Sequence, residues 1–144
     1  MNLEEIERCW LKEFEAIQRW QWAINKSQLK EKFPEVKFWT EMPEGFYMGK
    51  QHTLFGGSAS IVFSFTKDEK LSKVRILWES PTSDAYLRSK LTHIKSILDE
   101  VYGKSKVSNF SILWGRNEDT IELSIDELEN RMIMQFKPKN TSTT

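Results

Sequence analysis

Residues 58–79, SASIVFSFTKDEKLSKVRILWE, decide the fold, because they form two alternating apolar arms joined by a short charged link. Every second residue of each arm is bulky and apolar: Ile61, Phe63 and Phe65, then Val74, Ile76 and Trp78. Side chains alternate across a pleated strand, so a period of two is the signature of a half-buried strand. The link at residues 67–70 is charged, as an exposed hairpin turn should be. The stretch therefore predicts a central β-hairpin.

The composition is that of one globular domain. The chain has 144 residues, of which 39% are apolar and 29% charged. A chain of this length buries roughly two-thirds of its unfolded surface and needs no disulfide or metal to fold. Lys and Arg together number 21, as do Asp and Glu. The net charge is therefore zero, and no overall field draws the protein to nucleic acid or to an anionic membrane.

The sequence also predicts a cellular compartment. Cys9 is the single cysteine and cannot form an internal disulfide, which fits a reducing environment. The first ten residues, MNLEEIERCW, contain three acidic residues and no apolar core of a signal peptide. No run approaches the ~18 apolar residues of a membrane span. We therefore expect a cytoplasmic protein.

Two main amphipathic helices are expected. The first covers residues 2–25, with Asn2 as its N-cap and apolar residues at steps of three, four and seven. The second follows Ser83, a good N-cap, and its apolar stripe steps by four and three: Leu87, Leu91, Ile94, Leu98 and Val101. Gly103 is its expected left-handed C-terminal cap. A short helix over residues 27–32 lies between the first helix and the sheet.

The remaining strands complete an α+β fold. Three late segments alternate and two early apolar runs are short: residues 110–114, 121–125 and 132–136, then 36–40 and 46–48. We expect two main helices on one face of a mostly antiparallel sheet of about six or seven strands. Residues 1–137 form one domain, and residues 138–144 form a polar, disordered tail.

An internal repeat is a further interpretation of this layout. A helix followed by a meander occurs twice, which divides the chain into possible halves at residues 1–80 and 81–137. The segment Ser60–Phe65 is similar to the segment Thr120–Ile125, and each is followed by a charged turn and another strand. The alternative is that any two antiparallel hairpins look alike, and both interpretations stay open.

The second helix and the strands after it carry one recognisable pattern: Leu91, Ile94, Leu98, Tyr102 and Gly103, followed by Trp114. This layout resembles bacterial tandem helix-plus-meander domains, of which the β-lactamase inhibitory protein is an example. The resemblance implies a sheet whose concave surface binds another protein. The inhibitor of that family is secreted and disulfide-bonded, and this chain shows neither feature.

No signature of catalysis or metal binding is present. One cysteine and two distant histidines do not supply the clustered ligands of a metal site, so we expect no metal, no cofactor and no catalytic residue. The loop at residues 49–57 holds Lys50 and His52. Its glycines do not fit a phosphate-binding loop, which runs from a strand into a helix. This loop is either a surface hairpin or a ligand site that uses Lys50 and His52 as anion-binding or acid–base groups.

Two surfaces are candidates for binding a protein. At 100° per residue, Leu11 and Trp22 lie about 120–140° from the core stripe of the first helix. Tryptophan is enriched in interface hot spots, so this ridge is a candidate contact with a partner or with a second copy of the chain. The alternative is that residues 26–43 fold over the ridge.

The second surface is the sheet face opposite the helices. Its candidate partner-binding residues combine apolar and charged side chains: Arg75, Leu77, Leu113, Glu122, Arg131 and Ile133. A solvated face is the alternative, because antiparallel sheets often leave one face in water. Nucleic-acid binding is not expected, since the outward residues include no aromatic on which bases could stack.

These features together predict a non-enzymatic protein-interaction domain. A small bacterial or phage inhibitor, or an immunity-type factor, would have this character, with a protein partner and a homodimer as a further option. We expect neither a nucleic-acid nor a membrane partner. The alternative function is a small-ligand-binding or enzymatic domain that uses the loop at residues 49–57.

Overall fold

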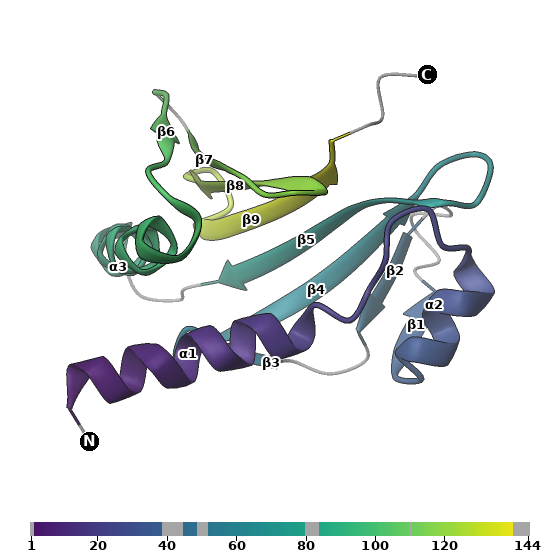
Figure 1. The fold of residues 1–144 in the computed structure, drawn as a ribbon, viewed down its shortest axis with the longest axis horizontal. Helices are drawn as coiled ribbons and strands as arrows, with labels where there is room; N and C mark the ends of the chain where they lie inside the picture. The colour runs from purple at the N-terminus through teal and green to yellow at the C-terminus, as the bar shows by residue number, and fades with distance from the viewer. Residues whose placement is uncertain (1, 39–44, 49–51, 80–83, 110, 140–144) are drawn as a thin grey trace.

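The computed structural model describes residues 2–38, 45–48, 52–79, 84–109 and 111–139. The helices in this part are α1 (Leu3–Ile17), α2 (Lys26–Lys32) and α3 (Asp84–Tyr102) (Figure 1). The strands are β1 (Val36–Phe38), β2 (Gly45–Met48), β3 (His52–Leu54), β4 (Gly57–Phe65), β5 (Leu71–Glu79), β6 (Lys106–Val107), β7 (Ser111–Gly115), β8 (Asp119–Asp126) and β9 (Arg131–Pro138). The predicted α+β class is confirmed.

All described strands join one antiparallel sheet. Its order is β1-β2-β4-β5-β9-β8-β7-β6, and β3 pairs with the first residues of β4. The nine strands exceed the six or seven expected, because the sheet gains strands of two to four residues such as β6 and β3. The strands β5 and β9 end the two meanders and pair with each other at the centre of the sheet.

The central hairpin is confirmed, and its register aligns the apolar residues across the sheet. Ile61 lies opposite Ile76, and Ile76 lies opposite Met134 on β9. The inner face is defined here by the buried residues on this side of the sheet: Ala59, Ile61, Phe63, Val74, Ile76, Trp78, Ile112, Trp114, Ile121, Leu123, Met132, Met134 and Phe136. Because side chains alternate along each strand, this matched register buries one face continuously.

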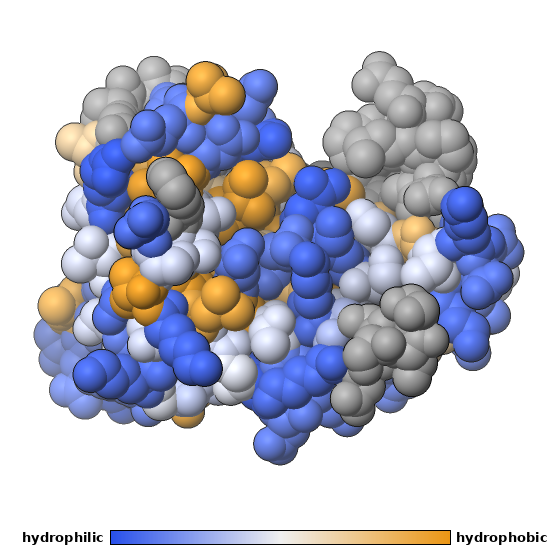
Figure 2. All heavy atoms as spheres, turned by 90° about the horizontal axis from the view of Figure 1, so that it is seen from above, coloured by the Kyte–Doolittle hydropathy of each residue, from blue (hydrophilic) through white to orange (hydrophobic). Residues whose placement is uncertain are grey.

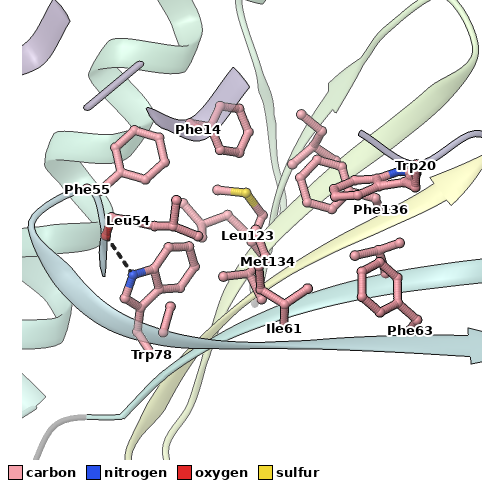
Figure 3. Close-up of a cluster of buried hydrophobic side chains, with 14 of the residues drawn as sticks. Phe14, Trp20, Leu54, Phe55, Ile61, Phe63, Trp78, Leu123, Met134 and Phe136 are labelled. Carbon is pink, nitrogen blue, oxygen red and sulfur yellow. Dashed lines mark hydrogen bonds between the residues drawn. The ribbon is translucent and has the colours of Figure 1, made fainter. Parts of the chain in front are cut away.

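The helices and the segments beside them pack on the inner face. Phe14 of α1 stacks on Phe136 with ring centroids 6.0 Å apart, and Phe33 at the end of α2 lies 5.2 Å from Phe63. Figure 3 shows Phe14, Trp20 and Phe55 gathered above Ile61, Phe63 and Met134. One buried cluster therefore includes residues from both halves of the chain.

Helix α1 is shorter than expected. The apolar pattern predicted a helix to residue 25, but α1 ends at Ile17. The segment after it makes backbone hydrogen bonds with β5: Ala23 N–H donates to the Leu71 carbonyl at 3.4 Å, and Leu71 N–H donates to the Ile24 carbonyl at 2.9 Å. This pairing and the positive φ of Ala23 are incompatible with a continuing helix. A capping box then begins α2.

Helix α3 follows its predicted stripe. Leu87, Ile94 and Leu98 are buried, whereas Val101 near the helix end is 40% exposed. Gly103 has φ 90° and its N–H donates to the Asp99 carbonyl, which is the left-handed cap expected from the sequence. The expected N-cap, Ser83, lies outside the described residues.

The C-terminal tail begins later than predicted. Strand β9 extends to Pro138, which lies opposite Asp119 of β8. Lys139 N–H also donates to the Glu118 carbonyl at 2.9 Å. The expected start of disorder at residue 138 is therefore wrong, and residues 140–144 lie outside the described part of the chain.

Candidate functional site

The outer face of the sheet brings six of the predicted site residues together. We define the outer face by the outward residues of β5, β7, β8 and β9 that follow the pleat: Lys73, Arg75, Leu77, Glu79, Ser111, Leu113, Gly115, Thr120, Glu122, Ser124, Asp126, Arg131, Ile133, Gln135 and Lys137. Leu113, Glu122, Gln135 and Arg75 form one row across four adjacent strands, in which each residue lies opposite the next. The predicted set Arg75, Leu77, Leu113, Glu122, Arg131 and Ile133 therefore lies on one face.

An apolar pair lies beside charged residues on this face. Leu77 of β5 lies opposite Ile133 of β9, and both side chains are half-buried. Val62 on the adjacent strand β4 also points outward and is only 3% exposed. The outer face thus combines a partly covered aliphatic centre with a charged surround.

Four cations lie on the same face of β5 and β9 as this apolar pair, three on one side of the pair along the strands and one on the other. The cationic cluster is Lys73, Arg75, Arg131 and Lys137. Lys73 and Lys137 flank the paired residues Val74 and Phe136, so they face each other across the two strands. Within the described part of the chain, the side chains of Lys73, Arg75 and Lys137 have no hydrogen bond or ion pair. These three cations are therefore not neutralised by the fold, whereas Arg131 has an ion pair with Asp126.

Burial and mutual repulsion act on these cations. Burial lowers the pKa of Lys73, and the charges of Arg75 and Lys137 lower it further. The pKa of Arg75 is lowered by burial and then by the charge of Arg131. The Nε atoms of both arginines are buried and have no hydrogen-bond partner among the described residues. Arg131 still has an ion pair, with its Nε 3.7 Å from Oδ2 of Asp126.

The ridge predicted on the first helix is not formed by that helix. Trp22 lies beyond the end of α1, and its Nε1 donates a hydrogen bond to Oδ2 of Asp119 at 3.2 Å. Leu11 is on α1, and both side chains pack partly buried against the core. The prediction failed in its geometry because the helix ends before Trp22. A role of these two residues in partner binding stays a prediction.

Asp119 belongs to a buried polar network that sequence reasoning missed. Arg116 donates two hydrogen bonds to the Asp119 carboxylate, at 2.7 and 2.8 Å, and a third to Oε1 of Gln18 at 2.6 Å. Asp119 is 4% exposed. Burial lowers the pKa of Arg116, but its bonds to Asp119 outweigh this and raise it. The network joins the end of α1 and Trp22 to the β7–β8 turn, where the sequence indicated only a charged turn.

The predicted ligand loop is only partly described. Lys50 lies outside the described residues, and His52 is half-buried at the start of β3. His52 lines a shallow pocket of about 500 Å³ beside Glu13 of α1 and Arg19, which follows that helix. The structure therefore does not test whether Lys50 and His52 lie together, and their role as a ligand site stays a prediction.

A lysine on α3 holds the turn between β3 and β4. Phe55 and Gly56 form this turn with φ 51° and 76°. Lys90 Nζ donates to the Phe55 carbonyl at 2.7 Å and lies 4.8 Å from the centre of the Trp10 ring. A Cβ on Gly56 would come within 2.8 Å of Trp10. Burial lowers the pKa of Lys90. These contacts stabilise the left-handed backbone conformation of the buried Phe55.

His93 connects the two long helices. Its Nε2 lies 2.8 Å from Oε1 of Glu7 on α1, and its ring contacts Trp10 edge-on at 5.1 Å. His93 is therefore a half-buried contact between α3 and α1. A helical-wheel argument treats each helix separately, and so it gave no signal for a contact between α3 and α1.

An open groove lies between α3 and the ends of β7 and β8. Its volume is about 810 Å³, and its apolar lining includes Leu91, Ile112, Leu123 and Ile125. Two further lining residues are exposed, Val107 at 67% and Leu128 at 97%. Figure 2 shows apolar residues among hydrophilic ones in its left half, the half that holds α3 and β6 in Figure 1.

Two searches of the described residues gave negative results. No group of three or more His, Cys, Asp and Glu side chains is arranged to hold a metal ion. In the same residues, no helix combines the length and the apolar character of a membrane span.

Neither a protein-family model nor a curated protein matches the chain. Among solved structures, it is similar to a DUF4309 family protein, YjgB, from Bacillus subtilis subsp. subtilis str. 168. The TM-score is 0.46 with 15% sequence identity, over 80% of this chain and 78% of that chain. This likeness carries no conclusion about function, and the β-lactamase-inhibitory-protein-like layout is not confirmed by it.

Proposed function

We propose that the protein is a non-enzymatic interaction domain that binds a partner protein through the outer face of its sheet. The observation that carries the proposal is the apolar pair Leu77 and Ile133, which lies among charged residues on the face opposite the helices. Protein interfaces commonly combine an apolar centre with a polar rim. Binding of this kind acts by steric and electrostatic complementarity, as a small inhibitor or immunity-type factor does.

The packing of the helices supports this proposal. Phe14, Trp20 and Phe33 all contact inner-face aromatic residues. The hydrophobic contacts of the described helices are thus directed to one side, and the other side retains its mixed surface. Antiparallel sheets allow this arrangement, since only one of their faces must be buried.

The test is capture of partners by tagged protein in which Leu77→Gln and Ile133→Gln are combined. We expect the proteins captured by the wild type to be lost with this variant, because its apolar centre is removed. The matched control combines Leu3→Gln and Val101→Gln, which change exposed apolar residues on α1 and α3. Circular dichroism verifies that both variants fold. Equal capture by the two folded variants would contradict the proposal.

The apolar groove supports a second candidate function, the binding of a small apolar ligand. Its volume is within the ~300–1,000 Å³ of known ligand sites, and Val107 and Leu128 leave apolar surface exposed at its edges. The test is a thermal-shift screen of apolar metabolites against the wild type and Val107→Glu. A compound that raises the melting temperature of the wild type alone supports this function. A screen without such a compound counts against it.

A further inference from the structure

The cationic cluster has a defined geometry on the outer face. Lys73 and Arg75 occupy successive outward positions of β5, and Leu77 occupies the next one. Outward positions along a strand are about 7 Å apart, and neighbouring strands are about 4.8 Å apart. On β9, Lys137 lies beside Lys73 and Ile133 lies beside Leu77. From Lys73 to Leu77 the face therefore changes from cationic to apolar, and beyond Leu77 the remaining cation, Arg131, lies opposite Glu79 and Asp126.

The fold itself gives no reason for three of these cations, Lys73, Arg75 and Lys137. Burial lowers the pKa of Lys73 and Arg75, and the neighbouring cations lower it further. Two acidic residues on the same face, Glu79 and Asp126, lie opposite Arg131. A third, Glu122, is separated from Arg75 by Gln135 and makes no ion pair with it among the described residues. Like charges that are partly removed from water destabilise a fold. A local arrangement that costs stability, such as this one, is expected at a functional site.

The surroundings of the cluster distinguish among anionic partners. Nucleic-acid binding favours a surplus of basic residues and aromatic side chains for stacking, but the net charge is zero and the outward residues of β5, β8 and β9 include no aromatic. Binding to an anionic membrane also favours a wide basic surface on the protein. A protein segment offers carboxylates and apolar side chains together, and arginine binds carboxylates in a bidentate manner.

We infer that the partner segment bound on the outer face is acidic, with carboxylates seated at Lys73, Arg75 and Lys137 and an adjacent apolar side chain at Leu77 and Ile133. This inference rests on the proposed function, which it makes more specific. Complementary charge would neutralise the cluster on binding, and it would also fix the direction in which the segment lies along β5.

The probe is a blocked ten-residue oligo-glutamate peptide, titrated into ¹⁵N-labelled full-length protein. We expect amide shifts centred on β5 and β9 that decrease as salt is added. Combining Lys73→Gln and Arg75→Gln is expected to weaken binding roughly fivefold or more. The matched control combines Lys12→Gln and Lys30→Gln, two exposed lysines on α1 and α2, and is expected to bind as the wild type does.

Several outcomes would overturn the inference. These are the absence of shifts in β5 and β9, equal weakening in the control, or binding of oligo-glutamine as tight as that of oligo-glutamate. Tighter binding of oligothymidylate or of phosphatidylglycerol vesicles would assign the cluster to nucleic acid or to a membrane instead. If a partner captured through Leu77 and Ile133 is retained by the Lys73→Gln and Arg75→Gln variant, the inference fails while the interaction function stands.

Discussion

The two faces of β5 and β9 differ in what their residues do for the fold. On the inner face, Ile76 and Met134 are opposite each other and fully buried. One residue away on each strand, Arg75 and Gln135 form the corresponding pair on the outer face and are half-buried. The inner pair is explained by the core alone. The core does not explain the outer pair, and this difference identifies the outer face as the candidate functional surface.

The largest expected effect is on the inner face. Phe136→Ala removes a ring that packs against Phe14 and Trp20, and we expect it to lower the free energy of unfolding by about 3–5 kcal/mol. Urea denaturation measures the change. Gln135→Ala on the outer face is the control, with an expected loss below about 1 kcal/mol. Similar losses for the two variants would mean that the two faces do not differ as described.

A second large effect on stability is expected from the polar network of Arg116 and Asp119. Asp119→Ala leaves the Arg116 guanidinium without its bidentate partner, and such losses in buried pairs typically destabilise by about 3 kcal/mol. Replacing both residues together, as in Asp119→Ala with Arg116→Met, should cost less than the single change. Thermal or urea unfolding provides the comparison. A double variant less stable than the single one would show that the pair contributes in another way.

Asp99 on α3 allows a pH-dependent test of stability on the side of the sheet that the helices cover. Burial opposes its ionisation, but hydrogen bonds from Lys95, Ser105 and Trp114 outweigh burial and lower its pKa from 3.8 to about 2. Because the folded-state pKa is depressed, its contribution is present above about pH 4 and is lost as the pH falls toward 2. Because solvent reaches this carboxylate and screens its interactions, the contribution amounts to about 1 kcal/mol.

The measurement compares urea unfolding of the wild type and Asp99→Asn between pH 2 and 6. We expect the wild type to be more stable at pH 6 and the two stabilities to converge as the pH approaches 2. A difference that stays constant over this range would rule out the ionised carboxylate as the source.

The smallest effect on stability is expected on the outer face. Arg75→Leu removes a partly buried cation that is repelled by Arg131, so the free energy of unfolding should stay the same or rise by up to about 1 kcal/mol. Urea denaturation at low and high salt measures this. Salt should stabilise the wild type more than the variant, because it screens the repulsion. A clear loss of stability would assign Arg75 to the fold.

The sheet could be predicted from local sequence because one face is buried. Alternation alone placed Ile61, Val74 and Met134 on one side and Leu77 and Ile133 on the other, and the register confirms this division. A shift of one residue would expose every core side chain, so the pattern determines the register strongly.

The failures have one physical cause, which is contact between segments far apart in the chain. The end of α1 depends on the pairing of Ala23 with Leu71, and the environment of Trp22 depends on Asp119, 97 residues away. Neither contact leaves a periodic signal in the sequence. The outer-face residues were found because they belong to strands, whereas the Arg116 network was missed because it joins a turn to a helix end.

The most direct test compares two adjacent residues of β5, using Arg75→Gln and Ile76→Ala. For each variant, urea unfolding and oligo-glutamate titration are measured on the same folded sample. We expect Ile76→Ala to lose about 2–4 kcal/mol of stability and keep its affinity. Arg75→Gln should keep its stability and bind the peptide more weakly. If Arg75→Gln loses stability, or if it binds the peptide as the wild type does, the outer face is not the binding surface described.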